Sequence, residues 1–171
     1  MLHQWQDKRT AEECAWANVQ ANINPTSFFV DRGGPLKAGE VKKVSSLFTK
    51  VSAEASAAAS VAKERWKRPR PFLTDTTLVP CVTMAPNFRA YPSGHATIGH
   101  ATAEALARLF PDRRAAFLAR GNEIALNRVI SGVHHPSDIE AGKECARQVM
   151  QKLLADPGFV ASMEELARQS R

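Results

Sequence analysis

The chain has 171 residues, of which 44% are hydrophobic and 23% are charged, and this is the composition of an ordinary globular protein. Its length suffices for one domain that buries a core without disulfides or metals, and its composition excludes an extended disordered chain. Lys and Arg number 23 against 17 Asp and Glu, a basic balance that favours anionic partners such as phosphate esters, nucleic acid or membrane surfaces without choosing among them.

No segment of the sequence has the character of a membrane span or of a secretory leader. The alanine-rich run 53–62 is interrupted and flanked by charged residues, and it falls short of the roughly 20 apolar residues that a span requires. Residues 1–9 lack the apolar stretch and the small-residue cleavage site of a secretory signal. We therefore expect no transmembrane helix and no export signal in this sequence.

The three cysteines, Cys14, Cys81 and Cys145, lie far apart and match no metal-ligand spacing. At most one disulfide can form among them, and one thiol must then stay unpaired within the chain. Buried free cysteines are the default expectation.

The first half of the chain contains two predicted helices and a long loop. Thr10 and Glu13 form the capping-box pattern of a helix that ends near residue 24. Apolar residues at helical spacing predict a long helix over about 39–66. Residues 72–91 contain several prolines and no helical period, so we expect a long loop, and long loops in compact domains are often functional.

The second half of the chain is predicted to be helical almost throughout. Three helices are expected over about 93–110, 113–130 and 136–154, and a short amphipathic helix over 159–167. Because no strand-like alternation is sustained, the predicted fold class is all-α, a single-domain helical bundle over 1–171 with a motif-bearing core at about 39–154. The loops that carry chemistry should gather at one end of the bundle.

Arg128 directs a charge into the predicted core, because helical spacing places it on the same face as Phe117 and Ile124. A buried unpaired guanidinium costs several kcal/mol, so Arg128 must meet either an acidic side chain or an anionic ligand. Glu123 is the candidate for a purely structural ion pair.

Residues 91–95, Tyr-Pro-Ser-Gly-His, lead from the predicted loop into a helix. The first amides of a helix point outward without partners, and the small Ser93-Gly94 pair lets an anion approach them closely. The alternative is that Ser93 merely caps the helix, which is a common role for serine.

His134 and Asp138 are four residues apart at the start of a predicted helix, with Pro136 suited to its first turn. The carboxylate of Asp138 can therefore reach back to one imidazole nitrogen and leave Nε2 of His134 available for attack. The structural alternative is a first-turn acid that complements the helix dipole beside an ordinary loop histidine.

A basic cluster, Lys63, Lys67, Arg68 and Arg70, lies at the end of the long predicted helix. The planar guanidinium of arginine holds two phosphate oxygens at once, so the cluster fits an anion site. A run of charges is, however, most often a solvated helix face.

Three motifs in order carry a resemblance to a known family: Lys63-(six residues)-Arg70-Pro71, then Pro92-Ser93-Gly94-His95, then Arg128-(five residues)-His134-(three residues)-Asp138. This pattern resembles the three-part signature of the type 2 phosphatidic acid phosphatase superfamily. Residues 63–72 and 90–95 look most like bacterial class A non-specific acid phosphatases. The resemblance covers Lys63 to about Gly142. The chain departs from it at Asn127, where the family usually has Ser, and at Arg89-Ala90, where class A enzymes typically have Gly-Ser.

The resemblance implies a helical bundle of the acid phosphatase and vanadium haloperoxidase type that hydrolyses phosphate monoesters through a phosphohistidine. It implies His134 as the nucleophile, His95 as the proton donor and Asp138 as the residue that orients His134. The residues implied to hold the phosphoryl oxygens are Lys63, Arg70, Ser93, Gly94 and Arg128. Neither metal nor cofactor is expected, because fixed Lys and Arg charges supply the electrostatics that metal ions supply elsewhere.

The resemblance also implies the partners and the compartment. Small-molecule phosphate esters would be substrates, inorganic phosphate and vanadate would be inhibitors, and nucleic acid is not expected to bind. A periplasmic or secreted location follows by family analogy, without excluding the cytoplasm, and a homo-oligomer is compatible with the sequence.

Two other functions remain in competition. A vanadium-dependent haloperoxidase uses the same kind of pocket to bind vanadate, although such enzymes are usually much longer chains. A non-catalytic anion-binding or nucleic-acid-binding module would account for the basic cluster, but it has no need of two histidines with a positioned Asp.

Overall fold

Helices and loops make up the part of the protein that the computed structural model describes, residues 1–28, 34–83 and 89–170, and no strand occurs in this part. The prediction of an all-α fold is therefore confirmed. The α-helices are α1 (Leu2–Lys8), α2 (Ala11–Val19), α3 (Ala38–Trp66), α4 (Pro71–Thr74), α5 (Gly94–Leu109), α6 (Arg114–Ile130), α7 (Pro136–Leu154) and α8 (Pro157–Gln169). Among the described residues, no helix combines the length and the apolar character needed to cross a membrane.

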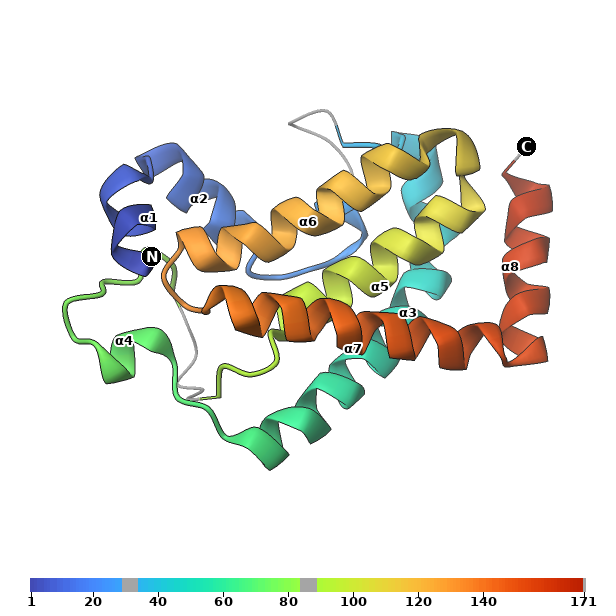
Figure 1. Ribbon diagram of the computed structural model, residues 1–171. Helices are drawn as coiled ribbons and strands as arrows, with labels where there is room; N and C mark the ends of the chain where they lie inside the picture. The colour runs from blue at the N-terminus through green and yellow to red at the C-terminus, as the bar shows by residue number, and fades with distance from the viewer. Residues whose placement is uncertain (29–33, 84–88, 171) are drawn as a thin grey trace.

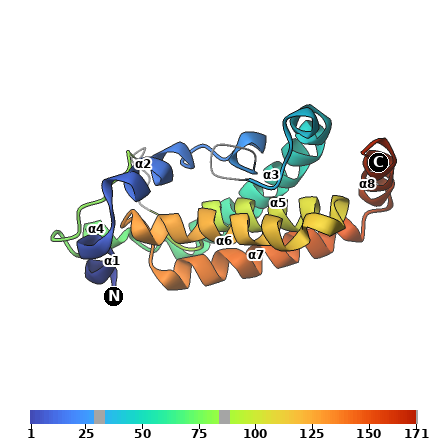
Figure 2. The same cartoon turned by 90° about the horizontal axis from the view of Figure 1, so that it is seen from above.

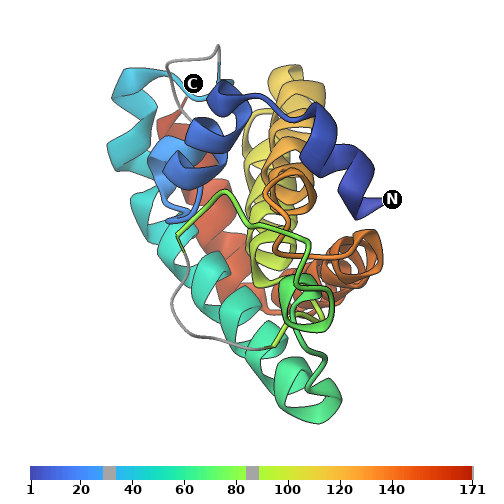
Figure 3. The same ribbon diagram turned by 90° about the vertical axis from the view of Figure 1, so that its left-hand side faces the viewer.

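Helix α5 lies at the centre of the bundle and packs against α3, α6 and α7 (Figure 1). Seen from above, α5, α6 and α7 run alongside one another, and α8 lies beyond their right-hand end (Figure 2). The main hydrophobic core is formed by apolar side chains from these same helices, among them Val51, Leu106, Phe117 and Met150. The ends of α3 and α6 and the starts of α5 and α7 lie toward the end of the molecule that faces the viewer in Figure 3, near the N-terminal helices.

The helices predicted over about 39–66, 93–110, 113–130 and 136–154 are confirmed as α3, α5, α6 and α7, with bounds that differ by no more than one residue. The predicted capping box is also present at the start of α2, where Glu13 N donates to Thr10 Oγ1 and Thr10 N donates to Glu13 Oε2. Helix α2 ends at Val19, earlier than predicted, because tertiary hydrogen bonds to Asn127 and Glu123 hold the next residue, Gln20.

Two short helices escape prediction from the sequence. Helix α4 lies at the start of the stretch expected to be a loop, and residues 84–88 of that stretch lie outside the described residues. Helix α1 is docked by contacts with distant parts of the chain. Gln6, for example, accepts a hydrogen bond from Val79 N at 2.6 Å and donates one to Thr77 O at 3.1 Å. Short helices of this kind depend on tertiary contacts, which local sequence patterns do not report.

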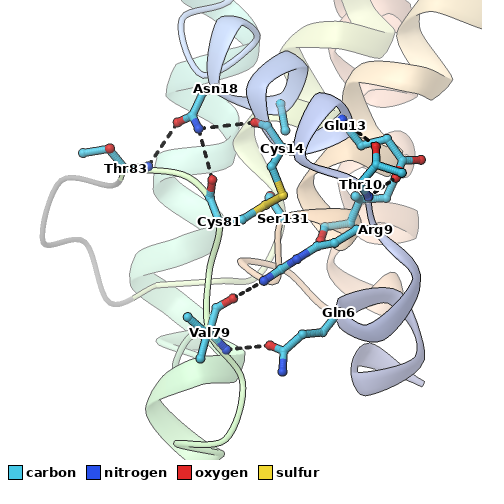
Figure 4. Close-up of a disulfide and its surroundings, with 12 residues drawn as sticks. Gln6, Arg9, Thr10, Glu13, Cys14, Asn18, Val79, Cys81, Thr83 and Ser131 are labelled. Carbon is cyan, nitrogen blue, oxygen red and sulfur yellow. Dashed lines mark hydrogen bonds between the residues drawn. A yellow bond between two sulfur atoms is a disulfide. The ribbon is translucent and has the colours of Figure 1, made fainter.

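A disulfide between Cys14 and Cys81 corrects the expectation of free cysteines, and Cys145 is the free thiol. The bond joins α2 to the segment that follows α4, across 67 residues of sequence (Figure 4). Asn18 strengthens the same junction: it donates to Cys81 O and accepts from Thr83 N, each at 3.1 Å. The pairing escaped prediction because it depends on the docking of two segments that are distant in sequence.

Gly142 is the point of closest approach between α7 and the start of α5. A Cβ atom at this position would lie 2.7 Å from Ala96 Cβ and 2.7 Å from the carbonyl oxygen of Ser93, distances that real Cβ atoms do not show. The missing side chain of Gly142 therefore allows α7 to pack directly on the first turn of α5.

Replacing Gly142 with Ala is expected to lower the free energy of unfolding by about 1–3 kcal/mol, the usual cost of overpacking a close contact. Gly39→Ala is a matched control, because a Cβ at Gly39 meets nothing within 4 Å. Its expected effect is a small stabilisation of at most about 1 kcal/mol, from the better helix propensity of Ala. Urea denaturation of both variants measures the difference, and equal stabilities would contradict this account of the α5–α7 contact.

Candidate active site

The three sequence motifs converge where α3 and α6 end and where α5 and α7 begin. Arg70 Nη1 of the first motif lies 2.6 Å from His134 Nε2 of the third. Ser93 N of the second motif donates to the main-chain oxygen of Asp138 at 2.9 Å. A Cβ on Gly94 would come within 3.9 Å of Lys63 Cε, so the lysine side chain passes over the start of α5. Residues from all three motifs thus form one cluster.

His134 and Asp138 form a buried pair, with exposed fractions of 1% and 0%. His134 Nδ1 lies 3.2 Å from Asp138 Oδ2, and the same oxygen accepts a hydrogen bond from His135 N at 2.8 Å. Because a carboxylate only accepts, Nδ1 carries the proton of the imidazole and the lone pair is on Nε2. The His134 lone pair is therefore directed at the Arg70 guanidinium.

The electrostatics of this pair keep the imidazole neutral and the carboxyl group ionised. Burial lowers the pKa of His134 well below its usual value, and the nearby Arg70 lowers it further, against the raising influence of Asp138. Burial is the strongest single influence on Asp138 and acts to raise its pKa. The interactions with His134, the hydrogen bond from His135 N and the charge of Arg68 together outweigh burial, so the net pKa lies below the usual value. A neutral imidazole with an unprotonated Nε2 is the form required of a nucleophile.

Three cations of the cluster are destabilised by their surroundings. Burial and the charge of Arg70 lower the pKa of Lys63 to about 8. Burial lowers the pKa of Arg70 to about 10, and burial together with the charge of Arg70 lowers that of Arg128 to about 10. Buried like charges of this kind are stable when an anion joins them, so the cluster has the character of an anion site.

Arg128 does not form the structural ion pair with Glu123 that the sequence allowed. Glu123 instead accepts from Arg120 Nη1 at 3.0 Å, and it also accepts hydrogen bonds from Trp16 and Gln20. Arg128 is 2% exposed; its Nη1 donates to Ala17 O at 3.3 Å, and its buried Nε has no partner among the described residues. Glu123 is therefore not the partner of this buried guanidinium.

His95 lies in the first turn of α5, and its Nε2 donates to the carbonyl oxygen of Ala21 at 3.0 Å. Burial, followed by the positive charge of Arg128, lowers the pKa of His95 to about 3. A proton donor must carry its proton at the start of the reaction. Without a bound anion this imidazole is neutral, so a role for His95 as proton donor requires an anion that raises its pKa.

Ser93 and Asn127 both have structural partners. Ser93 Oγ accepts from Ala96 N at 3.3 Å, so the residue does cap α5, as the structural alternative held, while it also lies in the cluster. Asn127 Nδ2 donates to Gln20 Oε1 at 2.6 Å. The residue that departs from the family pattern is thus held by the turn after α2.

Two features of the site were not assigned from the sequence. Arg68, which the sequence analysis placed in a general basic cluster, donates from Nη1 to Asp138 Oδ1 at 2.8 Å. The last turn of α2 and the residues after it cover the cluster, because Ala17 and Ala21 offer their carbonyl oxygens to Arg128 and His95. The positive charge of Arg68 could be read from the sequence, but its contact with Asp138 could not. Among the described residues, no group of three or more His, Cys, Asp or Glu side chains is arranged to hold a metal ion.

The fold and the site together define a class of protein: a bundle that is helical in the part the structure describes, whose helix ends bring two histidines, one of them paired with Asp, to a cluster of Lys and Arg. The family model of the PAP2 superfamily matches residues 43–143, more than half of the chain. The chain therefore belongs to the PAP2 superfamily, as the resemblance of its three motifs indicated.

Curated relatives carry phosphatase names. The chain is 39% identical over 112 residues to an acid phosphatase of Zymomonas mobilis. The matched region covers 63% of this chain and 42% of the relative. The chain is 31% identical over 155 residues to a non-specific acid phosphatase of Providencia stuartii. This match covers 87% of the chain and 62% of the relative. A shorter match, 46% identical over 55 residues, is to a lipid A 1-phosphatase of Rhizobium etli. It covers 32% of the chain and 24% of the relative. The chain thus spans less than two thirds of these relatives.

Proposed function

We propose that the protein is a metal-independent acid phosphatase that hydrolyses phosphate monoesters of broad specificity through a phosphohistidine at His134. The observation that carries the proposal is the buried His134–Asp138 pair with Nε2 of His134 directed at Arg70. The acid phosphatase names of two relatives and membership of the PAP2 superfamily support the same conclusion.

In the first step, His134 Nε2 attacks phosphorus in line and the bond between phosphorus and the ester oxygen breaks. Lys63, Arg70 and Arg128, with the hydroxyl of Ser93 and the amide of Gly94, bind the phosphoryl oxygens and neutralise the charge that develops on them. Asp138 stabilises the positive charge that forms on the imidazole of His134, the role of the carboxylate in a catalytic triad. His95 donates its proton to the departing alkoxide oxygen.

In the second step, a water molecule attacks the phosphohistidine and the bond between phosphorus and nitrogen breaks. His95, now neutral, accepts the proton of this water, and inorganic phosphate leaves. The cycle returns both histidines to their starting protonation states. Broad specificity follows if the phosphoryl group alone is recognised, because these residues then contact nothing else of the substrate.

An acidic pH optimum is the expected result of the charges around His95. Burial and the charge of Arg128 lower the pKa of His95 to about 3, and a bound phosphate group would neutralise that cation and raise the pKa. We therefore expect the alkaline limb of kcat to lie at higher pH than that of kcat/KM, which refers to the free enzyme and free substrate. Both profiles, measured with p-nitrophenyl phosphate, test this; activity that rises steadily into the alkaline range would contradict the assignment.

Trapping of the intermediate tests the mechanism itself. Protein mixed with labelled phosphate ester and quenched in alkaline denaturant should carry label on His134, because the phosphorus–nitrogen bond survives alkali better than acid. His134→Ala should carry none and should lack turnover, while His135→Ala, at the neighbouring position, should still be labelled at His134. Label on another residue, or full activity of His134→Ala, would overturn the proposal.

The same preparation separates the two competing functions. Halide oxidation by vanadate-loaded protein without ester hydrolysis would favour a haloperoxidase, whereas hydrolysis blocked by vanadate supports a phosphatase. Salt-sensitive nucleic-acid binding that survives loss of both His95 and His134 would favour a binding module.

We also propose a periplasmic or secreted location, as for class A acid phosphatases in general. The disulfide between Cys14 and Cys81 supports an oxidising compartment, because disulfides rarely persist in a reducing cytosol. Cell fractionation, with thiol trapping of the two cysteines in each fraction, tests the location.

A further inference from the structure

Arg68 connects the first and third motifs, although the family signature does not include it. Its Nη1 donates to Asp138 Oδ1 and to Ser137 Oγ, both at 2.8 Å. Its main-chain oxygen accepts from Ala90 N at 2.7 Å. The main-chain oxygens of the loop residues before the second motif in turn accept from Lys63 Nζ, at 2.8 Å for Arg89. Arg68 thus lies at a junction of the motifs.

The ion pair of Arg68 with Asp138 differs from an ordinary surface salt bridge. The Asp138 side chain is 0% exposed, whereas the Arg68 side chain is 36% exposed and reaches in from the surface. One carboxylate oxygen, Oδ2, is taken by His134 Nδ1 and His135 N, and the other, Oδ1, accepts from Arg68. A buried carboxylate needs hydrogen bonds to both oxygens, and in this protein Arg68 provides the bond to the second one.

We infer that Arg68 is a positioning residue for the nucleophile: it holds the Asp138 carboxylate ionised and with Oδ2 directed at His134 Nδ1. The inference rests on the proposed role of His134. If Arg68 is lost, Oδ1 is left buried without its charged partner, and the carboxyl group becomes free to turn or to take up a proton. Either change removes the acceptor that keeps the proton on Nδ1 and the lone pair on Nε2 of His134.

The consequence for catalysis is confined to the chemical step. Arg68 contacts Ser137, Asp138 and the main chain of Ala90, and none of these is proposed to touch phosphate. Loss of its charge should therefore lower kcat much more than it raises KM. Misplacement of a reacting group by about 1 Å costs roughly 100-fold in rate, which sets the scale of the expected effect.

The charged groups around Asp138 determine the direction of the pH effect. Besides Arg68, the cations are Lys63 and Arg70 across the cluster, and the neutral but titratable neighbours are His134 and His135. Lys63 and Arg70 remain charged when Arg68 is changed, so the comparison isolates the contribution of Arg68. Removal of its positive charge favours the protonated form of Asp138, and the acidic limb of kcat should move to higher pH.

The experiment compares Arg68→Gln, which keeps a hydrogen-bond donor without charge, with Arg68→Lys, which keeps the charge. We expect kcat of Arg68→Gln to fall about 10- to 100-fold, with KM within about twofold of the original protein. Arg68→Lys should recover most of kcat and restore the pH limb. Ser137→Ala, which removes the other side-chain partner of Arg68, and Arg65→Ala, an exposed arginine of the same region, should stay within about twofold.

A second measurement does not depend on turnover. The Asp138 carboxyl carbon, followed by ¹³C NMR in aspartate-labelled protein, should titrate at higher pH in Arg68→Gln than in the original protein or in Arg65→Ala. Circular dichroism confirms that each variant is folded, and Arg68→Lys serves if the neutral variant does not fold. An unchanged titration of Asp138, or an unchanged kcat in a folded Arg68→Gln protein, would overturn the inference. Absence of phosphatase activity in the original protein would instead overturn the proposed function, and the titration would still decide the role of Arg68.

Discussion

Asp138→Asn is expected to lower kcat by about 1,000-fold or more, the scale of effect known for the orienting carboxylate of a catalytic triad. The amide offers one acceptor and one donor, where the carboxylate offers two acceptors. If the amide oxygen faces Arg68, the NH₂ group faces His135 N and His134 Nδ1. That orientation moves the imidazole proton to Nε2 and removes the nucleophilic lone pair.

The opposite orientation of the amide is also unfavourable, because it keeps the acceptor toward His134 but turns the NH₂ group toward the Arg68 guanidinium. Neither arrangement reproduces the native contacts, so the loss should be large whichever one forms. Steady-state kinetics measures kcat, and phosphate binding by calorimetry is the control, because the cations at Arg70 and Arg128 are retained. An Asp138→Asn protein with more than a tenth of the original kcat would contradict the orienting role of this carboxylate.

Arg128→Met is expected to change activity and stability in opposite directions. Loss of a group that neutralises the developing charge on the phosphoryl oxygens should cost about 100- to 1,000-fold in kcat/KM. The free energy of unfolding without phosphate should rise by about 1–4 kcal/mol, because a buried cation whose Nε lacks a partner is replaced by an apolar chain of similar length. The methionine side chain is flexible enough to fill the space of the arginine stem.

Phosphate separates the two contributions of Arg128. A ligand that binds the folded state raises Tm, by an amount that grows with the logarithm of the ligand concentration relative to Kd, so phosphate should stabilise the original protein. The same phosphate concentration should give little or no rise in Tm for Arg128→Met. Arg65→Ala is the matched control and should respond to phosphate like the original protein. A variant that is destabilised without phosphate, and still stabilised by it, would show that Arg128 serves the fold and not an anion site.

The helices that carry the bundle were predictable because their signals are local. The apolar period of α3, the proline at the start of α7 and the capping box of α2 are properties of neighbouring residues. Helix α1 and the early end of α2 were not predictable, since each depends on side-chain contacts with residues far along the chain.

The same distinction between local signals and contacts of distant residues holds within the candidate site. The i, i+4 spacing of His134 and Asp138 predicted a contact that the structure contains at 3.2 Å. The choice for Arg128 between Glu123 and an anion remained open in the sequence, and packing excludes Glu123. Glu123 meets Arg120 and the side chains at the end of α2, because α2 docks on that face of α6.

His95 and His134, taken by themselves in the sequence, are equally compatible with structural roles. The order and spacing of the three motifs determined which residues enter the site, because motif spacing is a property of the chain. Tertiary structure alone decided the surroundings of these residues. Arg68 contacts Asp138, the carbonyl of Ala21 accepts from His95, and a disulfide joins Cys14 to Cys81, so that residues 67 to 74 positions apart meet. Contacts at such separations form only when helices pack, and burial in that packing lowers the pKa values of both histidines.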